Sequence, residues 1–149
     1  AGSTADCRPA WARRVEARER YPEKPMIDVT RLHHVSFAVA DLDASKKFFG
    51  ELIGFKELDR PAFGFRGAWY AIGDRQLHLI EHEGAGREVT GRISRSDHMA
   101  LEVKDLEQVR EQLEAANIQY GRGSNDDLGF SQIFCSDPDG HTIEFVRYF

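Results

Sequence analysis

The sequence predicts an α+β fold of two tandem β-α-β-β-β modules that form a curved mixed sheet around a metal-binding cavity. Three observations carry this prediction. A segment that begins at His33 recurs from Asp97, each copy alternates apolar and polar residues, and each copy leads into an amphipathic helix. His98 follows His34 by 64 positions, which sets the length of the repeat. The chain is therefore interpreted as one duplicated unit.

The first strand of each module is expected to have one apolar face, because successive side chains of a strand point to opposite sides. The residues that share this face are Val35, Phe37 and Val39 in the first copy and Met99, Leu101 and Val103 in the second. The opposite face carries small side chains and one histidine, His34 or His98. This pattern predicts a packed side and a second side on which a histidine stands above small groups.

A helix and three more strands are predicted to follow each of these strands. Asp41 and Asp105 are placed as helix N-caps, and Gly54 and Asn117 stand where the helices end. The further strands are expected near residues 55–59, 68–72 and 76–81 in the first module, and near residues 118–122, 131–135 and 142–147 in the second. Gly73 with Asp74, and residues 137–140, supply the last turn of each module.

Composition and charge exclude several classes of protein. The chain has 149 residues with 20 basic and 25 acidic side chains, and its net charge of −5 argues against a nucleic-acid partner. No segment has the roughly 20 apolar residues that cross a membrane, so no membrane partner is expected. Cys7 and Cys135 are interpreted as unpaired thiols of a cytoplasmic protein.

The first residues differ in composition from the rest and are interpreted as an N-terminal extension at residues 1–28. The segment from Trp11 to Tyr21 is rich in Arg and Glu, and is expected to be either a short helix docked by Trp11 and Val15 or a frayed leader. The predicted domain covers residues 29–149, with modules at about residues 31–83 and 96–148.

Four side chains are predicted to converge on a metal ion. An approximate twofold axis between the modules would place His34 opposite His98, and counting from the last turn of each module makes His78 the counterpart of Glu144. Three imidazoles and a carboxylate suit a borderline divalent ion such as Zn, Ni, Co, Mn or Fe. A metal would also satisfy Glu144, whose carboxylate lies in an apolar strand; the alternative is an outward-facing Glu144 on an edge strand.

Other polar residues have less definite roles. His78 is interpreted as a metal ligand, with a cavity wall or general base as the alternative. Glu144 and Glu102 are the candidate catalytic acids or bases, since Glu102 shares the strand face of His98, although a solvated Glu102 at the strand end remains open. His33, His82 and His141 are expected at the surface.

Residues 32–41, 48–55, 97–105 and 137–145 resemble the vicinal oxygen chelate superfamily, which includes glyoxalase I, methylmalonyl-CoA epimerase, fosfomycin-inactivating thiol transferases and extradiol dioxygenases. The resemblance spans roughly Arg31 to Tyr148. It implies metal ligands at His34, His98 and Glu144. The fourth-strand ligand position falls on His78, where glyoxalase I and the epimerase have Glu or Gln.

The resemblance implies a glyoxalase-family metalloprotein that uses a divalent ion as Lewis acid on a small oxygen-chelating substrate such as a thiol adduct, in a lactoylglutathione lyase or isomerase type of reaction. Three alternatives stay open: a fosfomycin-type thiol transferase, an extradiol dioxygenase, and a metal-free bleomycin-resistance-like binding protein. The last would use an aromatic pocket that includes Phe63, Phe65, Trp69 and Phe130. Short two-module chains of this family are commonly dimers, so a homodimer is expected.

Overall fold

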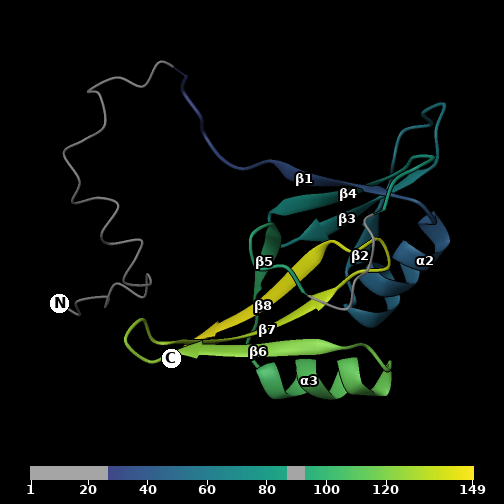
Figure 1. The fold of residues 1–149 in the computed structure, drawn as a ribbon. Coiled ribbons are helices and arrows are strands. Elements are labelled where there is room, and N and C mark those ends of the chain that lie inside the picture. The colour runs from purple at the N-terminus through teal and green to yellow at the C-terminus, as the bar shows by residue number, and fades with distance from the viewer. Residues whose placement is uncertain (1–26, 87–92) are drawn as a thin grey trace.

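The computed structural model describes residues 27–86 and 93–149, and its elements follow the predicted order (Figure 1). Module one consists of β1 (His34–Val39), α2 (Leu42–Lys46), the π-helix η1 (Lys47–Leu52), β2 (Lys56–Leu58), β3 (Gly67–Ile72) and β4 (Arg75–Glu81). Module two consists of β5 (His98–Glu102), α3 (Leu106–Ala115), β6 (Tyr120–Asn125), β7 (Phe130–Ser136) and β8 (Thr142–Tyr148). The predicted α+β fold of two modules is confirmed. Cys7 and the charged segment from Trp11 to Tyr21 lie outside the described residues.

Each module forms a four-stranded mixed sheet with the same topology. The strand orders are β1-β4-β3-β2 and β5-β8-β7-β6, and in each sheet the first strand runs parallel to the last. The register is also the same: His78 lies between Ser36 and Trp69 on its neighbouring strands. Glu144 lies between Ala100 and Phe134 in the same way. His78 and Glu144 therefore occupy equivalent positions in the two sheets.

The helix ends follow the local chemistry of the sequence. The side chains of Asp41 and Asp105 each accept hydrogen bonds from two backbone N–H groups of the first helical turn. Gly54 and Asn117 have φ values of 82° and 55°, the left-handed conformation that ends a helix. The predicted caps and ends are thus confirmed, and they fix where each helix crosses its sheet.

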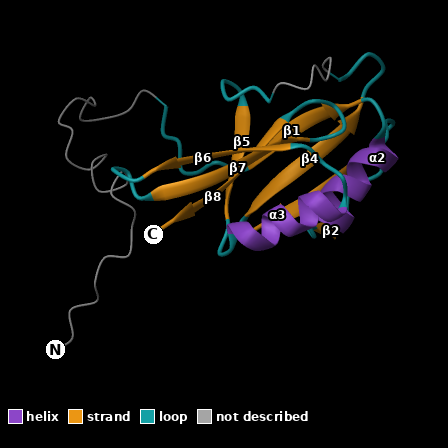
Figure 2. Cartoon of the chain, turned by 60° about the horizontal axis from the view of Figure 1, so that its bottom comes forward, coloured by secondary structure: helices purple, strands orange, loops and turns teal. Residues whose placement is uncertain are grey.

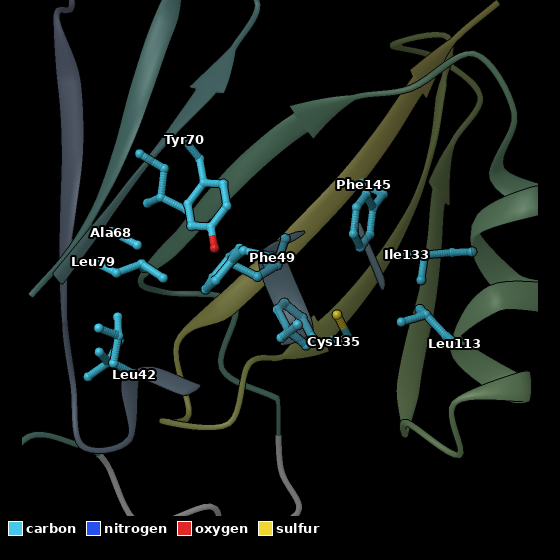
Figure 3. Packing of buried hydrophobic residues seen from close by; sticks show 13 residues of the cluster. Leu42, Phe49, Ala68, Tyr70, Leu79, Leu113, Ile133, Cys135 and Phe145 are labelled. Carbon is cyan, nitrogen blue, oxygen red and sulfur yellow. The ribbon is translucent and has the colours of Figure 1, made fainter. Parts of the chain in front are cut away.

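The two modules share one hydrophobic core, which lies on the helix-covered side of both sheets. Phe49 and Tyr70 from module one belong to the same buried cluster as Leu113, Cys135 and Phe145 from module two (Figure 3). Figure 2 shows α2 and α3 on the same side of the strands. Burial of this apolar surface holds the modules together, since each buried large side chain contributes about 1.5–3 kcal/mol.

The histidine-bearing face of each sheet therefore points away from the shared core. In β1 the exposed residues alternate with less exposed ones, and His34 is on the exposed side. In β5 the same alternation leaves His98 exposed. The cavity expected between these faces is not enclosed within the described residues, because the histidine-bearing faces of both sheets lie outside the shared core. None of the helices in the described ranges is long and apolar enough to cross a membrane.

The turn between β7 and β8 connects module two to module one. Buried Asp139 accepts a hydrogen bond from the Ala40 backbone N–H at 2.7 Å, and one from the Ser45 hydroxyl at 3.2 Å. A buried carboxylate is costly unless such donors satisfy it. The contact therefore fixes the end of β1 against the start of β8.

His141, in the same turn, does not lie at the surface, and the expectation of a surface role is wrong. Its ring stacks on Phe37 with centroids 4.3 Å apart, and its Nδ1 donates to Asp137 at 2.9 Å. Only about 16% of the His141 side chain is exposed. The error arose because a turn residue is usually exposed, whereas this turn packs against the other module.

Candidate metal-binding half-sites

The exposed face of module one carries a row of stacked rings. The ring of His78, on β4, lies between Trp69 of β3 and His34 of β1, with centroid distances of 4.3 and 4.2 Å. The interplanar angles are 11° and 13°, so the three rings are nearly parallel. Phe63 extends the row beyond Trp69 with a centroid distance of 5.9 Å. Neighbouring strands at the same level thus place two imidazoles in contact.

Hydrogen bonds determine which ring nitrogens of this pair can bind a ligand. The Nε2 atom of His78 lies 2.8 Å from the Gln76 amide oxygen, which only accepts hydrogen bonds, so Nε2 carries the proton and Nδ1 keeps its lone pair. The Nδ1 atom of His34 lies 2.9 Å from the corresponding atom of His33, which leaves its Nε2 unengaged by this bond. His78 therefore has a nitrogen suited to a metal, and Nε2 is the His34 nitrogen that lies outside the contact with His33.

The pKa of His78 is lowered from its usual value near 6.5. Burial is the largest cause, and the charges of His34, His33 and Arg60 act in the same direction. Neutral imidazole is the form that binds a metal ion. The surroundings of His78 therefore favour its ligand form at mildly acidic pH.

The exposed face of module two carries a different pair. The Nε2 atom of His98 lies 2.9 Å from a carboxylate oxygen of Glu144, while its Nδ1 lies 3.1 Å from the backbone carbonyl of Arg95. Because a carbonyl only accepts, Nδ1 carries a proton, and Nε2, which faces the Glu144 carboxylate, is the nitrogen at which a metal ion could replace this contact. Glu144 is only 8% exposed, so the alternative of a solvated Glu144 on an edge strand is wrong.

The four predicted ligands thus form two pairs, which we call half-site one (His34 and His78) and half-site two (His98 and Glu144). No group of three or more potential metal-binding side chains converges within residues 27–86 and 93–149. The donors themselves fit a divalent ion, since the pairs offer imidazole nitrogens and one buried carboxylate. The single chain therefore presents two incomplete donor sets on two outward faces.

The predicted base Glu102 does not belong to half-site two in this structure. It ends β5, at the opposite end of the strand from His98, and lines a cleft of about 520 Å³ with Ile53 and Phe55. A separate cleft of about 550 Å³ adjoins His98 at the seam between the modules, where Phe37 also lies. The ring of Phe130 makes an edge-on contact with Tyr148, and its ring contacts do not include Phe63 or Trp69.

Sequence reasoning missed three residues that shape the half-sites. Gln76 was detectable, because it lies two positions from His78 and so shares its strand face. Arg95 contributes a backbone carbonyl, which no side-chain pattern reveals. Arg60 lies in the loop before β3, and the fold alone brings it to the row of rings.

The duplicated β-α-β-β-β fold, with His78 and Glu144 at equivalent positions of its two sheets, is the glyoxalase fold. The chain belongs to the Glyoxalase/Bleomycin resistance protein/Dioxygenase superfamily, whose sequence profile matches residues 31–145. The resemblance seen in the sequence is thus confirmed.

Similar proteins include enzymes of two reaction types. Glyoxylase I 4 from Arabidopsis thaliana is 31% identical over 127 residues, which cover 81% of this chain and 72% of that protein. Glutathione transferase FosA from Serratia marcescens is 34% identical over 115 residues, covering 76% of this chain and 77% of that one. A glyoxalase family protein from Bacillus anthracis has a solved structure with the same fold, at a TM-score of 0.68 and 21% identity, covering 81% of this chain and 97% of that one.

Proposed function

We propose that this protein is a metal-dependent enzyme of the glyoxalase type, in which His34, His78, His98 and Glu144 hold one divalent ion. The observation that carries the proposal is the equivalence of the two half-sites. They occupy the same strands and the same register of a duplicated fold, and together they supply three imidazoles and one carboxylate. The proposed substrate is a small molecule with adjacent oxygens, such as a glutathione adduct.

The two half-sites are proposed to meet between two copies of the chain. Each copy exposes both histidine-bearing faces, because the helix-covered faces are buried in its own core. A twofold axis can place half-site one of each copy against half-site two of the other, which completes two equivalent sites in a homodimer. This arrangement leaves the core of each chain unchanged.

A bound divalent ion would supply Lewis-acid stabilisation of negative charge on substrate oxygens. The proposed role of Glu144 is to hold or move a proton, because its carboxylate already lies within hydrogen-bond distance of the His98 ring. The ring row of half-site one would exclude water from one side of the substrate. Gln76 and the Arg95 carbonyl orient His78 and His98 for these roles.

Thiol transfer is the second candidate reaction. It is favoured by the similarity to glutathione transferase FosA, which is 34% identical over 115 residues. Both reactions need the same completed donor set. They differ in whether the thiol is already part of the substrate or attacks it as a second reactant.

The proposal is tested by the metal content of the purified protein. We expect about one ion per chain in the wild type after incubation with Zn, Ni, Co, Mn or Fe(II), because the four donors form a complete site. His34→Ala and Glu144→Ala should each lower metal affinity by roughly tenfold or more, since each removes a side chain that is proposed to bind the ion directly. His82→Ala, an exposed histidine outside both half-sites, is the matched control.

The His78→Ala variant separates two versions of the site. Loss of metal comparable to that of the His34 variant would indicate four protein ligands, whereas retention would indicate a three-ligand site with His78 as an acid or base. Absence of metal from the wild type with every ion offered would contradict the proposal and favour a metal-free binding protein.

A further inference from the structure

Arg60 has no carboxylate partner among the described residues, unlike half of the arginines in those ranges. Four others pair with acidic side chains: Arg66, Arg75, Arg110 and Arg122. The guanidinium of Arg60 instead donates from Nη2 to the backbone carbonyl of Phe65 at 3.1 Å. Among the described residues, no acidic group within ion-pair distance neutralises its charge.

The guanidinium is held in place by aromatic rings. It lies 4.7 Å from the ring centroid of Phe63 and 4.7 Å from that of Phe65, and these two rings are stacked 5.4 Å apart. Cation–π contacts of this kind hold a long side chain in place without neutralising its charge. Phe63 and Phe65 are 44% and 48% exposed, which leaves an apolar surface around the cation.

One hydrogen-bond donor of Arg60 is left unused. Its Nε atom is buried and has no hydrogen-bond partner among the described residues, where it is the one such side-chain atom. Gly67 makes this position possible, because a Cβ there would lie 3.3 Å from Nε and 2.5 Å from the backbone oxygen of Leu79. This close packing encloses Nε and fixes the guanidinium, so an anion would approach its terminal nitrogens, of which Nη2 already donates to Phe65.

The position of Arg60 connects it to half-site one. Phe63, which contacts the guanidinium, is the outer member of the ring row that runs through Trp69 to His78. A substrate that binds at half-site one and extends along this row would reach the cation. Anionic oxygen groups bind a guanidinium well, because two parallel N–H donors of the guanidinium match two oxygen acceptors of the anion.

We propose that Arg60 is a specificity residue that binds an anionic oxygen group of the substrate, a carboxylate or a phosphonate, at the outer end of the ring row. The assignment of that group to the substrate rests on the proposed function. The affinity of Arg60 for an oxyanion is independent of the proposed function, because this affinity depends only on the residues of this chain.

The competing explanation is that Arg60 only fastens the loop before β3 through its bond to Phe65. That role would lower stability when Arg60 is replaced, and it would give no response to anions. Both explanations allow a lower stability when Arg60 is replaced, so stability does not distinguish them. Anion binding by Arg60 does, because only the proposal predicts it.

The first test titrates the metal-free protein with methylphosphonate and with acetate while following the arginine Nε–H resonances by NMR. We expect a saturable shift of the Arg60 resonance, because the guanidinium can form charge-assisted hydrogen bonds to the anion. The expected dissociation constant is on the order of 1 mM or below. Arg60→Gln should weaken binding about tenfold or more, and Arg60→Lys should restore part of it. Arg75→Gln, in an exposed ion pair of the same module, should bind as the wild type does.

A wild-type Arg60 resonance that does not respond to either anion would overturn the proposal, as would equal binding by the wild type and Arg60→Gln. Circular dichroism and urea denaturation of each variant show whether it is folded. If Arg60→Gln is unfolded, the response of the wild-type Arg60 resonance alone decides the outcome.

The second test compares lactate with malate on the metal-loaded protein by calorimetry. Both acids offer a hydroxyl and a carboxylate as neighbouring oxygens, and malate adds one carboxylate. We expect malate to bind about tenfold more tightly, and Arg60→Gln to remove this advantage while leaving lactate binding unchanged. Equal loss of both ligands would overturn the role of Arg60. Failure of the protein to bind metal would refute the proposed function, and the anion titration would still decide the role of Arg60.

Discussion

Module one and module two have the same backbone and place different chemistry on it. In module one, His78 pairs with Ser36 of the neighbouring strand. At the equivalent position of module two, Glu144 pairs with Ala100. Half-site one is a pair of stacked imidazoles, whereas half-site two is an imidazole in contact with a carboxylate. Duplication thus preserved the geometry while the donors diverged, and each module holds what the other lacks.

The modules also differ at the turn before their last strand. In module one this turn is the short Gly73 and Asp74, and Asp74 is exposed. In module two the turn spans residues 137–141, and its Asp139 is buried against module one. The longer turn forms hydrogen bonds to module one through Asp139. We therefore expect it to contribute more to stability than the turn of module one does.

The largest expected effect is on the free energy of unfolding when this connection is removed. Asp139→Ala leaves the Ala40 N–H and the Ser45 hydroxyl without their acceptor, which we expect to cost about 2–4 kcal/mol. Asp74→Ala, at the equivalent turn, should change stability by less than about 0.5 kcal/mol. Urea denaturation measures both. Equal losses would mean that the two turns do not differ as the structure indicates.

A smaller effect is expected in the pH dependence of the metal-free protein. Burial and neighbouring positive charges lower the pKa of His78 in the folded state, so the unfolded chain binds its proton more readily. The free energy of unfolding is therefore unaffected by the protonation of His78 at a pH above the pKa that this residue has in the unfolded chain. It decreases as the pH falls from that pKa toward the lower pKa of His78 in the folded protein. His78→Gln should show a weaker loss of stability below about pH 6.5 than the wild type does.

Urea midpoints measured across the acidic range give this comparison, and an NMR titration of the His78 ring gives its pKa directly. His82→Gln, at an exposed position, is the control. A pKa of the His78 ring above the usual value near 6.5 would contradict the account of half-site one.

Much of the fold was predictable because it depends on local patterns. The alternation in β1 and β5, the caps at Asp41 and Asp105, and the left-handed Gly54 and Asn117 are encoded within a few residues of each feature. The equivalence of His78 and Glu144 followed from counting back to each turn. These predictions needed no knowledge of how the modules pack.

What could not be predicted depends on packing between distant segments. The sequence does not reveal which faces of the two sheets meet, so the separation of His34 from His98 became visible only with the shared core. His141 was misplaced for the same reason, because its burial requires Phe37 of the other module. Arg60 was missed since a loop determines its contact with the ring row.

The central claim is that one metal site is built from half-sites of two chains, and mixing two inactive variants tests it most directly. His34→Ala has an intact half-site two, and Glu144→Ala has an intact half-site one. Unfolding both together and refolding them as a mixture should restore about a quarter of wild-type metal binding, because half of the dimers are mixed and each has one complete site. Each variant refolded alone should bind little metal. A mixture that binds no more than the separate variants would contradict assembly of the site across two chains.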